Sequence, residues 1–274
     1  MLENIRKKWS QLDNSQQNHI IDIIIVFLGV LIVVGLLIFI VGRRETDTKV
    51  ESFGTTDVIE TDEITYGIDV AKYQGTIDWQ QVAASGVDFV MVRVGNRTME
   101  DGTIHEDPTA KYNIEEASKY GIKVGVYFFS TAVTEKEALE EADWVAEFIS
   151  EYQISYPVAY NCEGFGKTEN RQYSLSKTQR TDLAIVFLNR INEYGYRPMF
   201  YGAKNELEDD KKWETSRLES LYKIWVAQYP SVPYPTTEAS SYAGKYDMWQ
   251  YTNQGIVPGI QTAVDMNVAY FGVY

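Results

Sequence analysis

From residue 64 onward, strand-like and helix-like segments alternate along the chain, and this alternation limits the possible fold more than any other feature. Five short runs of apolar or β-branched residues are each followed by a longer amphipathic stretch. Strand followed by helix, repeated, predicts parallel βα units. The expected strands cover residues 66–70, 89–94, 123–129, 157–163 and 198–201, and the expected helices cover residues 78–86, 108–120, 134–152, 176–195 and 205–220.

The pattern changes after residue 220. Three more strand-like runs, at 224–228, 246–252 and 263–269, are separated by segments too short or too rich in Pro and Gly for helices. The prediction is an α/β fold: an eight-stranded TIM-like barrel of five βα units followed by three strands with few or no helices. A hydrophobic content of 45% is enough for the core of one large domain of this kind.

Two of the expected helices begin with capping boxes, Thr134 with Glu137 and Ser176 with Gln179. The helix that follows Thr134 carries a run of acids between residues 135 and 147. We expect these acids to form a solvated helix face. Cys162, the single cysteine, is expected to pack against a helix as a small hydrophobic residue.

A span of nineteen residues without a charge, 23–41, precedes the barrel. This length of apolar chain is enough to cross a bilayer. A cleavable signal peptide is the rival, but the span is longer than a signal-peptide core and ends at Gly42-Arg43-Arg44 without a small-residue cleavage pattern. The predicted organisation is a short N-terminal cytoplasmic segment (1–19), a transmembrane helix (20–42), an acidic linker (43–63) and the barrel (64–274).

Three of the expected strands each deliver a carboxylate to what should be the same end of the barrel, namely Asp69, Glu163 and Asp265. The functional face of an α/β barrel lies at the C-terminal ends of its strands, where Asp69 and Glu163 fall, whereas Asp265 lies nearer the start of its segment. Side chains alternate along a strand, so Asn161 and Glu163 share one face. Any one such acid could simply cap a loop, but several around one cleft are typical of a glycosidase.

Colinear motifs over about residues 66–274 carry a resemblance to a known family. Gly67-Ile68-Asp69-Val70-Ala71-Lys72-Tyr73-Gln74-Gly75 followed by Ile77-Asp78-Trp79 resembles the first strand and helix start of the glycoside hydrolase family 25 muramidases. Further blocks follow in the family's order: Val92-Arg93-Val94, Asp107 with Asn113, Gly125-Val126-Tyr127, Tyr156-Pro157-Val158, Trp225-Val226-Ala227-Gln228-Tyr229, Trp249-Gln250-Tyr251 and Val264-Asp265-Met266-Asn267. The family's eight-stranded barrel agrees with the order of elements found above.

The resemblance implies roles for individual residues. Glu163 would be the general acid and base, Asp69 a carboxylate at the reacting sugar, and Asp265 a supporting acid. Asn161 stands where family members usually have the first acid of Asp-x-Glu. Asparagine still accepts and donates hydrogen bonds, and some hydrolases use the 2-acetamido group of the substrate in place of a protein nucleophile. Expected substrate-binding residues are Tyr127, Trp225, Gln228, Tyr229, Trp249 and Tyr251; of these, the aromatic side chains could stack on sugar rings or fill the core.

Together these features predict a peptidoglycan hydrolase that cleaves the β-1,4 bond between N-acetylmuramic acid and N-acetylglucosamine. The location of that substrate, with the apolar span, predicts a single-pass protein of the cell membrane whose barrel lies on the extracytoplasmic side. No cofactor or metal is expected, and the net charge of −14 offers no footprint for nucleic acid. Two alternatives stay open: a catalytically inactive barrel that binds glycan as a cell-wall interaction module, and a glycosidase for another N-acetylated polymer such as chitin.

Overall fold

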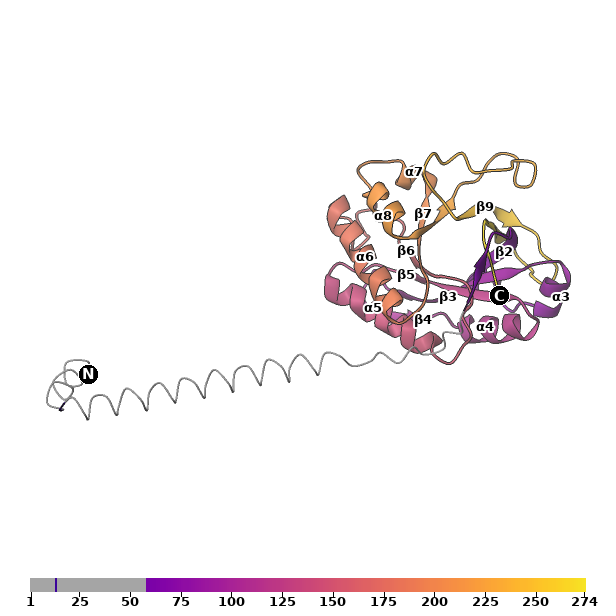
Figure 1. Ribbon diagram of the computed structural model, residues 1–274, viewed down its shortest axis with the longest axis horizontal. Coiled ribbons are helices and arrows are strands. Elements are labelled where there is room, and N and C mark those ends of the chain that lie inside the picture. The colour runs from indigo at the N-terminus through magenta and orange to yellow at the C-terminus, as the bar shows by residue number, and fades with distance from the viewer. Residues whose placement is uncertain (1–12, 14–57) are drawn as a thin grey trace. The chain divides into compact units, whose positions relative to one another are not determined.

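The computed structural model describes Asp13 and residues 58–274, and eight of the strands in this range close into a barrel (Figure 1). They are β2 (Thr65–Val70), β3 (Phe89–Arg97), β5 (Lys123–Phe129), β6 (Val158–Asn161), β7 (Pro198–Ala203), β8 (Lys223–Ala227), β9 (Met248–Gly255) and β10 (Val264–Ala269). Strand β2 pairs with both β3 and β10, which closes the ring. The expected eight-stranded barrel is therefore confirmed.

One barrel strand runs against the others. Every neighbouring pair from β2 through β3 to β9 is parallel, whereas β10 is antiparallel to both β9 and β2. The start of β10 therefore lies beside the end of β2, and Asp265 is the register partner of Asp69. This reversal brings the start of the last expected strand to the same rim as the ends of the others.

Helices cover part of the barrel wall. They are α3 (Trp79–Ala84), α4 (Ala110–Lys119), α5 (Glu135–Ile149), α6 (Lys177–Glu193), α7 (Lys204–Leu207) and α8 (Thr215–Leu221), with a 3-10 turn, η1, at Lys72–Gln74. Figure 1 shows α5 and α6 side by side, and they make extensive contact. In the part of the chain that the structure describes, no helix follows α8.

The expected single helix at 205–220 is wrong, because the chain forms the two short helices α7 and α8 instead. Between them the Asp209 carboxylate accepts a hydrogen bond from the Lys211 main-chain N–H, which favours a turn. Trp213 is buried in the core, and the Glu214 N–H donates to the Thr181 hydroxyl on α6. Burial of the indole and this tie to α6 override the helical pattern of the segment.

Three short strands lie outside the barrel ring. Strand β4 (Ile104–Glu106) forms a hairpin with the end of β3. Strand β1 (Glu60–Thr61) pairs antiparallel with β11 (Gly272–Val273), which joins the two ends of the described domain. Strand β1 lies inside the range 43–63 that the sequence assigns to the linker.

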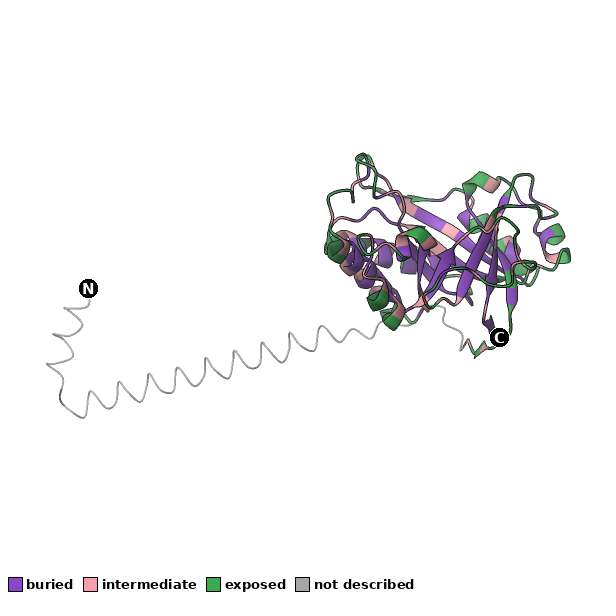
Figure 2. Cartoon of the chain, turned by 90° about the horizontal axis from the view of Figure 1, so that it is seen from above, coloured by how far each residue is buried: buried purple, intermediate pink, exposed green. Residues whose placement is uncertain are grey.

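Two apolar layers hold the barrel together, and Figure 2 shows its strands as the most buried elements. Inward-facing side chains such as Phe89, Met91 and Met199 fill the interior. Outward-facing strand side chains such as Val90 and helix side chains such as Phe187 of α6 form the layer between barrel and helices. Cys162 belongs to this outer layer, as expected, and is 2% exposed. Its neighbours Asn161 and Glu163 take the opposite face.

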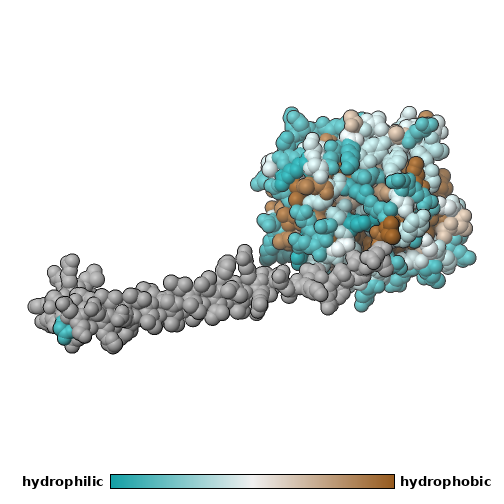
Figure 3. All heavy atoms as spheres, viewed as in Figure 1, coloured by the Kyte–Doolittle hydropathy of each residue, from teal (hydrophilic) through white to brown (hydrophobic). Residues whose placement is uncertain are grey.

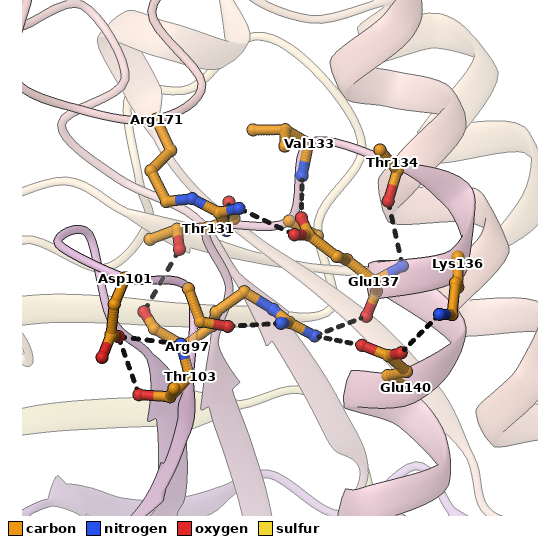
Figure 4. A network of polar contacts seen from close by, with 12 residues as sticks. Arg97, Asp101, Thr103, Thr131, Val133, Thr134, Lys136, Glu137, Glu140 and Arg171 are labelled. Atoms are coloured by element: carbon orange, nitrogen blue, oxygen red, sulfur yellow. Dashed lines mark hydrogen bonds and ion pairs between the residues drawn. The ribbon is translucent and has the colours of Figure 1, made fainter.

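The capping predictions hold with one difference. At α6, Ser176 and Gln179 form the full reciprocal box. At α5 the Thr134 hydroxyl accepts from the Glu137 N–H, but the Glu137 carboxylate accepts from the Val133 N–H rather than from Thr134 (Figure 4).

The prediction of a wholly solvated acidic face on α5 is wrong at one position. Glu141 has no exposed surface and pairs with Arg97 at 2.8 Å. Arg97 is the last residue of β3, and its side chain also contacts Glu137 and Glu140 of this helix (Figure 4). Burial raises the pKa of Glu141 to about 7, and the ion pair with Arg97 opposes this rise.

The outer surface of the domain is mainly polar, and Figure 3 shows hydrophobic residues in scattered groups on one face. The predicted cytoplasmic segment apart from Asp13, the predicted transmembrane helix and most of the linker lie outside the described residues. Within the described ranges, none of the helices has the length and hydropathy needed to cross a bilayer.

Candidate active site

A cavity of about 340 Å³ opens at the rim where the parallel strands end. All four predicted catalytic residues, Asp69, Asn161, Glu163 and Asp265, contribute to its wall. The remaining lining residues are Ala71, Tyr73, Gln74, Arg93, Tyr127, Phe129, Tyr201, Trp225, Tyr229 and Gln250.

Asp69 lies at the base of this cavity, 6% exposed, near the end of β2. Its Oδ2 accepts hydrogen bonds from Gln250 Nε2 and Asn267 Nδ2, each at 2.8 Å. Asn267 Oδ1 in turn accepts from the Trp225 indole at 2.8 Å, and Gln250 Oε1 accepts from the Tyr229 hydroxyl at 2.7 Å. Because hydrogen bonds from Trp225 and Tyr229 fix the two amides, the amides in turn fix the orientation of the Asp69 carboxylate.

Glu163 stands two residues beyond the last residue of β6, so the expected strand end at 163 is two residues too long. Asn161 closes the strand ladder opposite Phe129 and is 4% exposed. Its Nδ2 donates to Glu163 Oε2 at 3.3 Å, whereas its buried Oδ1 has no hydrogen-bond partner. An unpaired acceptor at this depth is costly unless a ligand supplies the donor.

The carboxyl groups of the cavity influence one another's ionisation. Burial raises the pKa of Asp69 well above its usual range, and the neighbouring Asp265 charge adds to this, against the hydrogen bonds from Asn267 and Gln250. Burial and the charge of Glu163 raise the pKa of Asp265 to about 6. Burial also raises the pKa of Glu163, and contacts with Asn161 and Tyr201 oppose the effect. The three carboxyls of the cavity therefore retain protons to a higher pH than exposed carboxyls do.

The structure brings only some of the predicted substrate-binding residues to the cavity. Tyr127, Trp225 and Tyr229 line it, with Trp225 buried as part of the floor and Tyr229 47% exposed at the edge. Tyr229 is the most exposed of the three and therefore the one best able to stack on a sugar ring.

Gln228, Trp249 and Tyr251 lie outside the cavity, which corrects their expected placement. Trp249 and Tyr251 belong to the outward face of β9, in the layer around the barrel. The Trp249 indole donates to the Gln228 carbonyl at 2.7 Å, and the Gln228 side chain accepts from Ser240. The period-two alternation of β9 explains the error, because Gln250 between the two aromatic residues takes the inward position.

Sequence reasoning gave no role to several residues that complete the site. Gln250 and Asn267 orient Asp69, as described above. Arg93 forms a salt bridge of 2.6 Å with the buried Asp107 and lies over the Tyr73 ring at the far end of the cavity. The Tyr201 hydroxyl donates to Gln250 Oε1 at 3.1 Å. Tyr201 lies outside the motifs quoted above, whereas the other residues fall within them, and strand alternation inside those motifs identifies Gln250 and Asn267 as inward-facing.

This polar cavity combines an acid of raised pKa with further carboxyls and fixed amides. Such a set can protonate a leaving oxygen and stabilise positive charge that develops beside it. At the C-terminal rim of an α/β barrel, this arrangement defines a glycosidase. Comparison with known proteins agrees. Residues 68–260 match the model of glycosyl hydrolases family 25, and the chain belongs to this family.

Relatives are distant in sequence. The chain is 26% identical over 201 residues to the autolytic lysozyme of Clostridium acetobutylicum, an alignment that covers 73% of this chain and 54% of that protein. It is 25% identical to lysozyme M1 of Streptomyces globisporus, covering 73% of this chain and 66% of that protein. The match thus spans only about half to two thirds of these relatives.

Solved structures share the fold. The modular autolysin LytC from Streptococcus pneumoniae superposes with a TM-score of 0.61 at 26% identity, covering 78% of this chain and 47% of that one. The bacterial lysozyme from Streptomyces coelicolor superposes with a TM-score of 0.55 at 22% identity, covering 74% of this chain and 90% of that one.

Proposed function

We propose that this protein is a membrane-anchored muramidase that cleaves the β-1,4 bond between N-acetylmuramic acid and N-acetylglucosamine in peptidoglycan. One observation supports this most strongly: in a family 25 barrel, Asp69, Glu163 and Asp265 meet around one cavity in which burial raises the pKa of each. The lysozymes and the autolysin among its relatives support the choice of substrate. LytC has also been solved in complex with a synthetic peptidoglycan ligand.

Glu163 is the proposed general acid and base. Burial raises its pKa and so favours the protonated form that can donate to the leaving oxygen, and its place in the cavity wall leaves it accessible to substrate. The charges that Asp69 and Asp265 carry when ionised would stabilise the positive charge that develops at the anomeric carbon.

Asn161 fits a reaction in which the substrate's own acetamido group acts as nucleophile. Its unpartnered Oδ1 is available to accept the acetamido N–H. The acetamido carbonyl oxygen would bond to the anomeric carbon as the bond to the leaving oxygen breaks and Glu163 protonates that oxygen. The resulting oxazolinium ring keeps its N–H on Asn161. Glu163 then removes a proton from water, which attacks the anomeric carbon, so that the configuration is retained.

The stereochemistry of the fresh product tests this step. Proton NMR should show the retained anomer. An inverted anomer, or a glycosyl group trapped on Asp69, would exclude participation of the acetamido group.

The overall function is tested with the purified full chain and peptidoglycan. We expect fragments that end in reducing N-acetylmuramic acid, and we expect Glu163→Gln to lower the rate about 10² to 10⁴-fold with little change in thermal stability. Glu169→Gln is the matched control, because Glu169 is an exposed acid on the same loop. Unchanged cleavage by Glu163→Gln would end the assignment of Glu163. Reducing N-acetylglucosamine ends would instead indicate another bond, and glycan binding without cleavage would favour the non-catalytic module.

A further inference from the structure

The loop between β6 and α6 carries Glu163 and is unusually rich in buried polar side chains. Asn170 is 4% exposed and Gln172 has no exposed surface. Polar residues are seldom buried in a loop unless their hydrogen bonds are satisfied, and here those bonds join the loop to itself and to the neighbouring strand end.

Asn170 holds the main chain of Glu163 directly. Its Nδ2 donates to the Glu163 carbonyl at 3.2 Å, and its Oδ1 accepts from the Gln172 N–H at 2.8 Å. Glu163 lies beyond the end of β6, so no strand ladder fixes its backbone. Gly164 follows at φ 72°, a turn conformation that favours glycine. The hydrogen bond from the Asn170 side chain to the Glu163 carbonyl thus replaces the main-chain hydrogen bond that a neighbouring strand would supply.

Gln172 and Arg171 anchor the loop to the segment that follows β5. Gln172 Nε2 donates to the Ala132 carbonyl at 2.7 Å, and its Oε1 accepts from Cys162 Sγ at 2.7 Å. Arg171 donates to the Thr131 carbonyl at 3.1 Å and to Glu137 Oε1 at 2.7 Å (Figure 4).

The same segment also supports Asn161. The Ser130 N–H donates to the Asn161 carbonyl at 2.8 Å. The Ser130 hydroxyl donates to the buried Glu141 of α5 at 2.6 Å, and Glu141 pairs with Arg97. One connected polar network therefore runs from α5 to Asn161 at the end of β6 and to Glu163 in the loop that follows.

We propose that Asn170, anchored by Gln172, is a positioning residue that sets the place of the Glu163 carboxyl in the cavity. The inference rests on the proposed role of Glu163 as general acid. Asn170 itself does not line the cavity, so it acts through Glu163 and does not contact substrate. A displacement of a reacting group by about 1 Å can lower a rate by about 10²-fold, so loss of this support should appear mainly in kcat.

The test uses the purified full chain, peptidoglycan fragments and two substitutions. Asn170→Ala removes both hydrogen bonds. Asn170→Asp keeps the size of the side chain and the acceptor for the Gln172 N–H but, when ionised, cannot donate to Glu163. We expect both to lower kcat at least 10-fold with KM changed less than about 2-fold. Asn192→Ala, at an exposed position near the end of α6, is the matched control and should change neither constant.

Two further readouts separate positioning from a general loss of structure. Because burial keeps the pKa of Glu163 raised, a Glu163 that moves into solvent should move the alkaline limb of the pH–rate profile to lower pH. In a Glu163→Gln background, Asn170→Asp should cause no further loss of the residual rate, since both act through one group.

Each outcome decides the question. Wild-type kcat and pH profile in a folded Asn170→Ala protein would overturn the positioning role, as would additive losses in the double variant. If neither variant folds, Asn170 is a structural residue and the proposal is wrong. Absence of hydrolysis by the wild-type chain would instead refute the proposed function.

Discussion

At the scale of single residues, the most consequential feature is that three carboxyl groups, those of Asp69, Glu163 and Asp265, share a small cavity with the amide of Asn161. The unusual member is Asn161, because an amide cannot exert the like-charge effect that a second carboxylate on this strand would exert on Glu163. Burial is the main cause that raises the pKa of Glu163. Two predictions at this scale follow from charge and burial.

Asn161→Asp should move the alkaline limb of the pH–rate profile upward. The general acid must be protonated, so activity is lost as the pH rises through the pKa of Glu163. A new carboxylate beside it raises that pKa further and extends activity to higher pH. Rates measured across pH, with Asn161→Ala as an uncharged comparison, test this. An alkaline limb that stays in place or moves to lower pH would show that the two side chains do not couple electrostatically.

Asp69→Asn should make the protein more stable at neutral pH while it lowers activity. The pKa of Asp69 is raised in the folded state, so folding favours its protonated form and stability falls as the pH rises above the usual range of the group. An asparagine keeps an acceptor for Gln250 and Asn267 and removes the charge. We expect the variant to melt a few degrees above the wild type at pH 7.5 and at the same temperature near pH 3. Each kcal/mol of added unfolding free energy raises the melting temperature of a domain of this size by about 2–4 °C. A variant that is less stable at pH 7.5 would show that the hydrogen bonds outweigh the charge.

At the scale of elements, the reversed direction of β10 decides the composition of the site. Because this strand is antiparallel to β2, its beginning meets the end of β2, and Asp265 faces Asp69 across the pair. A parallel eighth strand would have placed the start of this segment at the opposite end of the barrel. The helix-free last three strands therefore contribute an acid and two amides to the same rim.

The terminal pair β1 and β11 should contribute measurable stability. Glu60 of β1 forms ion pairs with Arg197 at 3.0 Å and Lys223 at 3.3 Å, and Thr61 pairs with Gly272. We expect residues 64–274 to melt a few degrees below residues 58–274, a loss of about 1 kcal/mol after solvent screening of these half-buried charges. Differential scanning calorimetry of the two fragments provides the measurement. Equal melting temperatures would show that the pair is incidental to the fold.

At the scale of the whole molecule, the proposed function requires a particular topology. The uncharged span at 23–41 lacks a cleavage pattern, and the proposed substrate lies outside the cytoplasm. If the part of the acidic spacer that precedes the described domain, roughly 15 residues, behaves as a flexible coil, it spans about 20 Å, which would confine cutting to the neighbourhood of the membrane.

Residues 45–274 should therefore lie outside the cytoplasm and stay joined to the span. Protease added to intact, wall-stripped cells should digest or shed the barrel, with a cytoplasmic protein as the protected control. A barrel that survives this treatment and is cut only after lysis would contradict the orientation.

The sequence by itself determined the barrel and most of its elements. Alternating apolar runs and amphipathic stretches report local preference and burial, so the eight strands and the capped helices α5 and α6 could be predicted from neighbouring residues alone. The same alternation put Asn161 and Glu163 on one face and Cys162 on the other. Local patterns fail where distant contacts compete with them, as at Trp213 between α7 and α8 and at Glu141 of α5.

Only the tertiary structure decided how the site is composed. No local signal gives the direction of β10, because that direction depends on which strand closes the ring. The pairing of Asp265 with Asp69 follows from this direction, so no local signal gives it either. Other features of the site also depend on contacts between residues far apart in the chain or beyond a strand end. They are the outward direction of Trp249 and Tyr251, the hydrogen bonds from Gln250 and Asn267 to Asp69, and the hydrogen bond from Asn170 to the Glu163 carbonyl. Side-chain geometry of this kind arises when the barrel closes, and a sequence pattern with a range of a few residues cannot encode it.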